Sequence, residues 1–455
     1  MGSKLFGSSG ARGRANVDLT PDLFNRIGSA TAIQFKIQKA FVARDTRVSS
    51  LTYEYALVSG LLAGGTCVTS LGVTATPVLA YLTRMLGADA GFMITASHNP
   101  AEYNGLKIFN HEGMAYDSER QEKIEGAIRR ESLDLPDWHK VGKCLPSSGS
   151  DAQYIEMVRK KLDLRKKWHI AVDSGGGATY HIAPTLFKML GCKVMAINAQ
   201  PDGLFKGRSP EPNADSLKLF ASIVKDFGII GIAYDGDGDR VAFIDETGSF
   251  ADFDRVLAAY ARYVLSRRPG SVIVTNVEAS MCIEKIVDKY EGKLVRGKVG
   301  DVYVADCMKR HNAVFGGEPC GAWIHPQFNY CPDGVLSSVL LLKALEDENK
   351  SLHELVEEMP QYPTLRQNIP CHENVKCNAL QKLETELRSA FPASKDISKI
   401  DGVRLSVKGG WILVRASGTE PLIRLTVEGE TLEAAIRLKD KTVKLVGEIL
   451  GELEK

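Results

Sequence analysis

A serine, a histidine and a lysine stand close together in one stretch of the chain, and their types suit nucleophilic or covalent chemistry. Ala90 to Thr95 is an apolar run that predicts a short buried strand, and an Asn-Pro turn signal follows it. Ser97 and His98 therefore lie on a loop at the end of a rigid strand, near Lys107. Folds display nucleophilic or covalently modified serines at such positions. A lone Ser-His pair, however, is more often a turn whose serine bonds a backbone amide.

Three carboxylates at alternate positions, Asp235, Asp237 and Asp239, form a strong site signal between apolar strands expected at 228–234 and 241–245. Oxygen ligands without cysteine or histidine favour Mg²⁺ or a similar hard cation. The spacing resembles an EF-hand loop, but Arg240 occupies the position that requires glycine, and strands flank the loop. A solvated acidic turn is disfavoured, because three like charges between buried strands repel one another unless a cation offsets them.

Two loops rich in glycine, hydroxyls and arginine are suited to hold anions. The first, at residues 6–13, includes Arg12 and is either an anion-binding loop or a flexible turn. The second offers a set of groups that would surround a phosphate: Arg415, Ser417, Gly418, Thr419 and Arg424. Because arginine bonds phosphate oxygens in a planar fork, the second loop predicts a phosphate clamp rather than a decorated hairpin.

A lone carboxylate, Glu318, lies in a further glycine-rich turn beside Cys320. Glu318 either accepts hydrogen bonds from sugar hydroxyls or is a surface turn residue, and its neighbours leave both interpretations open. The Ser-Gly-Gly-Gly run at 174–177 lacks the Lys-Ser/Thr of a Walker loop, so it predicts a tight strand-to-helix turn.

Strands and helices alternate through the first part of the chain and must position these residues. Helices are expected at 20–40 and at 51–64, and a third is expected to end at residue 86. In the first of them, Thr20 is the expected N-cap and Pro21 the first helical residue. Strands are expected between them, at 41–44, 68–73 and 90–95. The alternation predicts a parallel, doubly wound sheet. Ligands of such sheets bind beyond the carboxyl ends of the strands, where Ser97 lies.

Composition shifts divide the chain into four expected domains: 1–148, 149–250, 251–364 and 365–455. A Pro-Ser-Ser-Gly-Ser cluster at 146–150 marks the first boundary, and prolines between 360 and 370 mark the last. The first three domains have the α/β pattern. The last is a smaller α+β unit, with strands expected at 403–407, 411–414 and 422–428 and a helix from 431 to about 453.

Composition excludes several classes of protein. The net charge is +1 over 455 residues, so no long-range field favours nucleic acid or an anionic membrane as a partner. The nine cysteines are irregularly spaced and form no C-x-x-C pair, which favours a reduced, cytoplasmic compartment over disulfides or a zinc site. No apolar run has the length of a signal peptide or a membrane span.

Four motifs occur together in one order: Thr95-Ala-Ser-His-Asn-Pro100, Asp235-Gly-Asp-Gly-Asp-Arg240, Gly317-Glu-Pro-Cys-Gly321 and Arg415-Ala-Ser-Gly-Thr-Glu-Pro421. In these motifs the sequence closely resembles the α-D-phosphohexomutase family, and the resemblance covers the whole chain. It implies four domains around a central cleft, three of them α/β and the fourth smaller. It also implies a phosphohexomutase that moves a phosphate between the 1- and 6-positions of a hexose.

The resemblance implies a role for each candidate residue. Ser97 would be the phosphoserine, and its phosphate would complete an Mg²⁺ site formed by Asp235, Asp237 and Asp239. Arg12, His98 and Lys107 would surround the transferring phosphoryl group. The sugar phosphate would be bound by the remaining candidates: Arg240, Glu318, Cys320, Arg415, Ser417, Gly418, Thr419 and Arg424. A hexose 1,6-bisphosphate would be both intermediate and activator, and the enzyme would be a monomer or a homodimer.

The sugar loop departs from the pattern Glu-x-Ser-Gly-His of many relatives, because Cys320 replaces the serine and Ala322 the histidine. The stretch from Thr76 to Gly91 looks more like phosphoglucosamine mutases than phosphomannomutases, so glucosamine phosphate is the expected substrate. The alternatives are a phosphomannomutase or phosphoglucomutase, a sugar phosphatase with Asp235 as nucleophile, and a sugar-phosphate-binding protein without catalysis.

Overall fold

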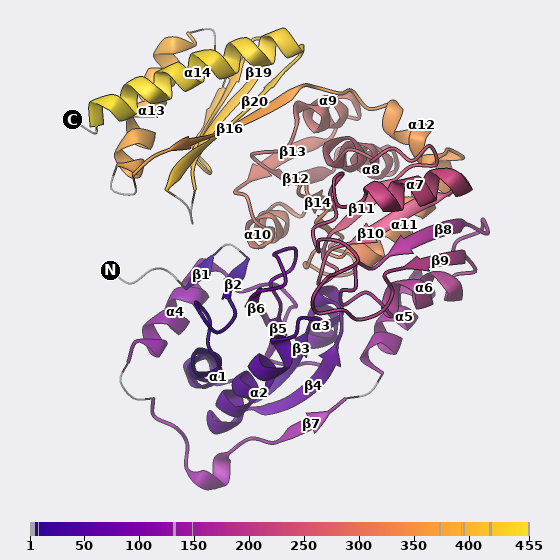
Figure 1. Cartoon of the computed structure of the whole chain (residues 1–455), viewed down its shortest axis with the longest axis vertical. Helices are drawn as coiled ribbons and strands as arrows, with labels where there is room; N and C mark the ends of the chain where they lie inside the picture. The colour runs from indigo at the N-terminus through magenta and orange to yellow at the C-terminus, as the bar shows by residue number, and fades with distance from the viewer. Residues whose placement is uncertain are drawn as a thin grey trace.

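The structure, a computed structural model, describes residues 5–7, 9–130, 133–147, 149–372, 375–392, 394, 396–417 and 421–453. Four sheets follow one another along the chain, each with its own helices, and they form four units (Figure 1). The first unit lies at the bottom of Figure 1, the second and third at its right, and the fourth at its top left. The expected four-domain α/β architecture is therefore confirmed.

The first unit consists of β1 (Phe6–Gly7), β2 (Gly10–Arg14), α1 (Pro21–Phe35), β3 (Lys39–Arg44), α2 (Ser50–Ala63), β4 (Cys67–Val73), α3 (Thr76–Met85), β5 (Ala90–Ile94), β6 (Tyr103–Asn110), α4 (Ser118–Ile128), the 3₁₀ helix η1 (Trp138–Lys140) and β7 (Cys144–Pro146). Its sheet has the order β1-β2-β6-β5-β3-β4-β7. Only β5, β3, β4 and β7 run parallel. The expectation of a purely parallel sheet is wrong, because β6 folds back directly on β5 without a crossover helix.

The start of the chain also differs from the expectation. The glycine-rich stretch 6–13, expected as a loop, forms the antiparallel hairpin β1–β2, and β2 pairs with β6 so that Arg12 lies opposite Gly105. The first helix begins as predicted: Pro21 is its first residue, and the Thr20 hydroxyl accepts a hydrogen bond from the Leu23 amide at 3.3 Å. Arg12 is therefore held on a strand of the main sheet.

Helices cover both faces of the first sheet, as a doubly wound fold requires. Successive side chains of a strand point to opposite faces. On β3, Ala40 and Val42 pack in the cluster that contains residues of α1 and α2, such as Tyr53. Phe41 and Ala43 belong to the cluster that contains residues of α3. The rigid β5, between β3 and β6, is buried along its whole length and carries the Ser97 loop at its end.

The second unit contains α5 (Ser150–Lys161), β8 (His169–Asp173), α6 (Ile182–Met189), β9 (Lys193–Ile197), α7 (Lys218–Phe227), β10 (Ile230–Tyr234) and β11 (Val241–Ile244), with the sheet order β11-β10-β8-β9. The third contains α8 (Phe253–Arg267), β12 (Val272–Asn276), α9 (Met281–Lys289), β13 (Lys293–Gly297), α10 (Asp301–His311), β14 (Phe315–Gly317), β15 (Trp323–Ile324), α11 (Gly334–Glu348) and α12 (Leu352–Glu357), with the order β13-β12-β14-β15.

Each of these two sheets has three parallel strands and one antiparallel edge strand. The edge strand forms a hairpin with the last parallel strand. The loop of hairpin β10–β11 is the acidic stretch 235–240, and the loop of hairpin β14–β15 is the stretch with Glu318. Both candidate loops therefore project from the carboxyl end of a buried parallel strand.

The fourth unit has one sheet and two main helices: β16 (Thr364–Pro370), α13 (Lys376–Ala390), β17 (Asp396–Ser398), β18 (Val403–Val407), β19 (Gly410–Ala416), β20 (Leu422–Gly429) and α14 (Leu432–Leu453). The sheet is antiparallel throughout, in the order β16-β20-β19-β18-β17. Both helices lie on one face of the sheet (Figure 1), and leucines such as Leu383 and Leu425 form a core of its own. This is the expected α+β unit.

The first three units share one apolar core, whereas the fourth is joined more loosely. Tyr81, Tyr154 and Tyr260, one from each of the first three units, belong to a single buried cluster. The fourth unit contacts the third through a small cluster that includes Met281 and Trp411. Within the described part of the chain, no helix is both long and apolar enough to cross a membrane.

Helices α1 and α2 approach closely because each presents a glycine to the other. A Cβ atom at Gly60 would lie 2.0 Å from the Asn25 carbonyl oxygen, and one at Gly28 would lie 2.5 Å from the Leu57 carbonyl oxygen. Gly126, in the exposed part of α4, has no atom within 4 Å of such a Cβ.

We expect Gly60→Ala to destabilise the protein by about 1–3 kcal/mol, the usual cost of forcing extra atoms into a packed contact. Gly126→Ala should instead stabilise it by about 0.5–1 kcal/mol, because alanine restricts the unfolded chain and favours helix. Urea denaturation of both variants measures the two effects. Equal effects of the two substitutions would contradict the close contact between α1 and α2.

Candidate active site

The predicted nucleophile and the acidic triplet meet where the first two units touch. Ser97, on the loop after β5, is 1% exposed, and its hydroxyl donates a 2.6 Å hydrogen bond to Asp235. Its φ of 52° is left-handed, a conformation that a non-glycine residue keeps only when its surroundings enforce it. The Thr95 hydroxyl accepts a hydrogen bond from the Ser97 amide at 2.8 Å. The loop thus holds the Ser97 hydroxyl directly against the carboxylates.

The three aspartates form a compact buried set. Their ligand oxygens lie within 4.8 Å of one another, and one oxygen each of Asp237 and Asp239 is buried with no hydrogen-bond partner among the described residues. Burial, reinforced by the neighbouring carboxylates, raises the pKa of Asp235 well above its ordinary value and also raises the pKa of Asp239. Clustered carboxylates with unpartnered oxygens fit a divalent cation, which would offset this repulsion.

Lys107 supplies one positive charge to this set. It lies on β6, and its ammonium is 2.7 Å from Asp237 and 2.5 Å from Asp239. Burial opposes the charge of Lys107, but Asp237 and Asp239 outweigh it and raise the pKa of the ammonium. Lys107 also lowers the pKa of Asp237 against the opposing effect of burial, and the Thr76 hydroxyl adds a 2.5 Å hydrogen bond. Lys107 is therefore a fixed cation.

His98 and two arginines border the same place. His98 Nδ1 is 3.4 Å from the Ser97 hydroxyl oxygen. Burial, followed by repulsion from Arg240 and Arg12, lowers the pKa of His98 to about 2, so its imidazole is neutral at physiological pH. Arg12 donates a 3.1 Å hydrogen bond to Asn99, while its Nε is buried without a partner among the described residues. The group combines a neutral base with fixed positive charge.

The sugar loop is packed against the acidic loop. Glu318 is buried and accepts hydrogen bonds from Asn276 at 2.7 Å and from the Gly300 amide at 2.8 Å. Burial, followed by Asp301, raises the pKa of Glu318. Gly321 has a φ of 83°, and a Cβ there would lie 2.1 Å from the Val241 carbonyl oxygen, so this position requires glycine.

Cys320 of the sugar loop and Arg240 of the acidic loop are neighbours where these two loops meet. Burial raises the pKa of the Cys320 thiol to about 12, which keeps it in the neutral form. Burial opposes the charge of Arg240, but the carboxylates of Asp239, Asp235 and Glu318 outweigh it and raise the pKa of Arg240. Arg240 thus joins the acidic loop to the sugar loop.

The predicted phosphate clamp lies across a cleft from these residues. Arg415 on β19 and Arg424 on β20 are direct cross-strand neighbours, and the Ser417 carbonyl accepts a 3.0 Å hydrogen bond from Lys376. Gly418 and Thr419 lie outside the described residues. A cleft of about 670 Å³ is lined by residues of the first, third and fourth units, among them Arg12, Arg415, Ser417 and Arg424.

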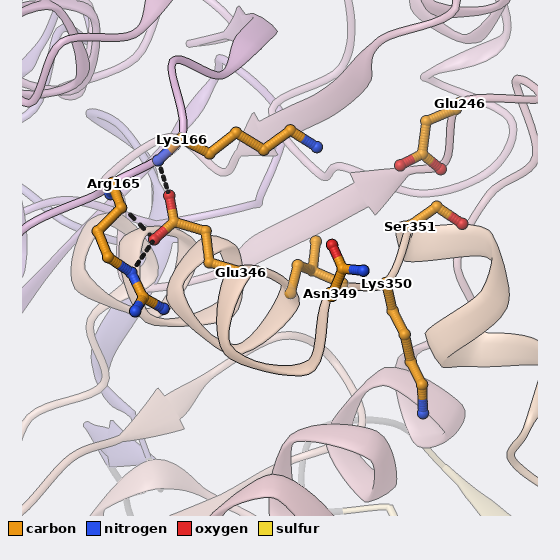
Figure 2. Close-up of a pocket in the computed structure, with 8 residues that line it drawn as sticks. Arg165, Lys166, Glu246, Glu346, Asn349, Lys350 and Ser351 are labelled. Atoms are coloured by element: carbon orange, nitrogen blue, oxygen red, sulfur yellow. Dashed lines mark hydrogen bonds and ion pairs between the residues drawn. The ribbon is translucent and has the colours of Figure 1, made fainter.

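A second hollow, of about 450 Å³, lies between the second and third units (Figure 2). Figure 2 shows Glu346 of α11 turned toward Arg165 and Lys166, whose backbone amides donate to it at 3.0 and 2.7 Å. None of the predicted site residues lines this hollow. The candidate active site is therefore the cleft beside the acidic triplet.

Arg47 is a site residue that the sequence analysis missed. It is 2% exposed and pairs with Asp45 at 3.0 Å, and its guanidinium donates to the carbonyl oxygens of Ser97 at 2.8 Å, Asn99 at 2.6 Å and Tyr103 at 2.8 Å. Arg47 lies in the stretch 45–50, between the strand expected at 41–44 and the helix expected at 51–64. The sequence does contain a signal for Arg47: Asp45 and Arg47 carry opposite charges just after a central strand, and ligand sites of such sheets lie at the carboxyl ends of strands.

Comparison with known proteins agrees with this geometry. Models of the phosphoglucomutase/phosphomannomutase family match the chain in order: α/β/α domain I at residues 3–134, domain II at 152–248, domain III at 252–362 and the C-terminal domain at 373–445. The chain therefore belongs to the phosphoglucomutase/phosphomannomutase family, the α-D-phosphohexomutases.

Two relatives and one solved structure are similar to this chain over nearly its whole length. The chain is 41% identical over 452 residues to a probable phosphoglucosamine mutase of Methanopyrus kandleri, covering 99% of both chains. It is 40% identical over 455 residues to a phosphoglucosamine mutase of Methanocaldococcus jannaschii, covering 99% of this chain and 100% of the relative. A crystal structure of a phosphoglucomutase/phosphomannomutase family protein from Burkholderia thailandensis is 26% identical, with a TM-score of 0.89 over 98% of this chain and 97% of that one.

We expect Arg47→Met to destabilise the protein by about 3–5 kcal/mol, because it leaves the buried Asp45 carboxylate uncompensated. Arg14→Met, which breaks the exposed Arg14–Asp18 pair, is the matched control and should leave the melting temperature nearly unchanged. Thermal denaturation measures both. A melting temperature of Arg47→Met equal to that of the control would show that Arg47 does not hold the Ser97 loop.

Proposed function

We propose that this chain interconverts glucosamine 6-phosphate and glucosamine 1-phosphate through a phosphoserine at Ser97 and a bound 1,6-bisphosphate. As a phosphohexomutase it is an isomerase. The observation that carries the proposed role of Ser97 is its 2.6 Å contact with Asp235, inside the acidic triplet. Arg12, which interacts with Asp237 and Asp239, also lines the 670 Å³ cleft together with Arg415, and this cleft is where we propose that the hexose phosphate binds.

Phosphoryl transfer needs in-line positioning and neutralisation of charge more than covalent assistance. A sugar hydroxyl oxygen attacks the phosphorus of phosphoserine, the bond from phosphorus to Ser97 Oγ breaks, and the proton lost by the hydroxyl ends on Ser97 Oγ. His98, whose Nδ1 is 3.4 Å from Ser97 Oγ, is placed to relay this proton, and the negative charge of a phosphoserine beside it would raise its low pKa. Lys107 is held protonated by its aspartates, so it and Arg12 supply positive charge instead.

Asp235, Asp237 and Asp239, completed by the serine phosphate, would hold Mg²⁺. Three buried oxygen ligands without cysteine or histidine match the preference of this cation. When bound, Mg²⁺ supplies Lewis-acid stabilisation of the phosphate charge. The aspartates themselves are held by Lys107, Thr76 and the amides of Gly238 and Arg240.

The phosphate that is not reacting would bind at Arg415, Ser417 and Arg424, completed by Gly418 and Thr419. The bisphosphate would then turn end for end and return its other phosphate to Ser97. This requires a clamp that holds one phosphate while the other reacts at Ser97 and that releases its ligand between the two transfers. The loosely joined fourth unit suits a clamp that moves between these steps.

The names of the relatives at about 40% identity support glucosamine phosphate as the substrate. Glu318 would accept hydrogen bonds from the sugar, with Cys320 and Arg240 beside it. Glucose and mannose phosphates are the alternative substrates, and a coupled assay with glucosamine, N-acetylglucosamine, glucose and mannose phosphates separates them. A phosphatase that uses Asp235 as nucleophile is disfavoured, because Asp239 stands where the Asp-x-Asp-x-Thr pattern of such enzymes has threonine.

We also propose that the enzyme acts in the cytoplasm, as a monomer or a homodimer, with a hexose 1,6-bisphosphate as activator. The eight cysteines whose side chains are described are all free thiols, which supports a reducing compartment.

We expect Ser97→Ala to abolish interconversion of the 1- and 6-phosphates, because it removes the oxygen that we propose carries the phosphoryl group. The purified wild-type protein should carry one phosphate at Ser97 by mass spectrometry, and the variant none. Ser222→Ala, on the exposed surface of α7, is the control and should retain full activity. Undiminished turnover by Ser97→Ala would refute the phosphoserine mechanism.

We expect Mg²⁺ to raise the melting temperature and Asp239→Asn to remove this effect, with Asp306→Asn, 54% exposed on α10, as control. Because its pKa is raised, the Asp235 carboxyl of the metal-free site stays protonated at pH values at which an ordinary aspartate is ionised. Binding of the cation must release this proton, so the shift should be larger at pH 8 than at pH 5. An equal shift in Asp239→Asn would place the cation elsewhere.

A further inference from the structure

The arginine of the proposed phosphate clamp is already held by two carboxylates. One terminal nitrogen of Arg415 pairs with Glu278, a residue of the third unit, and the other pairs with Asp401 at 2.8 Å. The three side chains are 17%, 29% and 24% exposed respectively, so the ion pairs are partly withdrawn from water. The guanidinium therefore lies between two protein anions at the place proposed for a phosphate.

The two carboxylates, those of Asp401 and Glu278, belong to different units of the fold. Asp401 belongs to the fourth unit, like Arg415, and also accepts a 3.0 Å hydrogen bond from the Val299 amide of the third. Glu278 belongs to the third unit and reaches Arg415 across the cleft. Glu278, Asp401 and Arg415 all line the 670 Å³ cleft together with Ser417 and Arg424. The Glu278 carboxylate thus stands inside the volume that a bound phosphate would enter.

We propose that Glu278 is a built-in competitor of the substrate phosphate. Its carboxylate occupies Arg415 when the clamp holds no phosphate, gives way when a sugar phosphate binds, and returns when that phosphate leaves. This role rests on the proposed function, because it gives Glu278 a place in the exchange of the two ends of the bisphosphate. Glu278 acts through Arg415 and is therefore a positioning residue.

The competition has a physical basis on both sides. An arginine that is partly withdrawn from water is costly without an anion, and Glu278 supplies one in the ligand-free cleft. A phosphate monoester carries a charge of about −1.5 to −2 and offers more acceptor oxygens than a carboxylate, so it displaces Glu278. When the bisphosphate turns, the clamp must release one phosphate before it takes the other. A returning carboxylate keeps Arg415 paired during this step and so lowers the barrier to release.

The test compares Glu278→Gln, which keeps the shape of the side chain and removes its charge, with the parent protein. We expect the KM for glucosamine 6-phosphate to fall about 1.5- to fivefold, the range of a partly exposed ion pair, and kcat to fall as release slows. The dissociation constant of glucosamine 6-phosphate, measured by calorimetry in a Ser97→Ala background that cannot turn over, should fall by the same factor.

Glu284→Gln is the matched control. Glu284 pairs with Arg296 of its own unit at 2.8 Å and with Arg404 of the fourth unit at 3.6 Å, so it also joins the two units, but it does not line the cleft. An unchanged or higher dissociation constant in Glu278→Gln, or an equal fall in Glu284→Gln, would overturn the proposal and leave Glu278 as a tie between units. If the parent protein turned over none of the hexose phosphates, the proposed function would fail, and the calorimetric comparison alone would decide the role of Glu278.

Discussion

Repulsion among three buried carboxylates is the constraint on which the rest of the structure depends. Asp235, Asp237 and Asp239 lie within one small volume that excludes water, where like charges interact strongly. The surrounding elements each bring a group that offsets this repulsion. Strand β6 contributes the ammonium of Lys107, helix α3 the hydroxyl of Thr76, and the loop after β5 the hydroxyl of Ser97. The acidic loop of the second unit is thus completed by groups from the first.

The same arrangement explains why the sites of separate units converge. In the second and third units an antiparallel edge strand returns alongside the last parallel strand, so each hairpin loop emerges at the carboxyl end of its sheet. Gly321 of the second hairpin packs on the Val241 backbone of the first, and this contact fixes the distance between Glu318 and the aspartates. The fourth unit has an apolar core separate from that of the first three. Its polar contacts to the third unit include Arg415 with Glu278 and Asp401 with the Val299 amide.

Much of this could be predicted from the sequence, because the signals were local. The apolar run before Ser97, the alternation of aspartate with glycine, and the cap at Thr20 each depend on neighbouring residues, and the structure agrees with them. The features that were missed depend on long-range pairing. Nothing local shows that β2 pairs with β6, that Arg47 reaches the carbonyl oxygens of Ser97 and Asn99, or that Glu278 meets Arg415 across 137 positions of the chain. Such pairings become visible only when the topology is known.

The left-handed backbone of Ser97 has a consequence for how this chain can change over evolutionary time. A serine in that conformation is less stable than a glycine would be, since glycine adopts it without steric conflict. Glycine at this position would relieve the backbone but would lose the hydroxyl and its hydrogen bond to Asp235. Under the proposed phosphoserine mechanism, the group that the reaction needs thus carries a backbone cost, which selection for turnover would have to maintain.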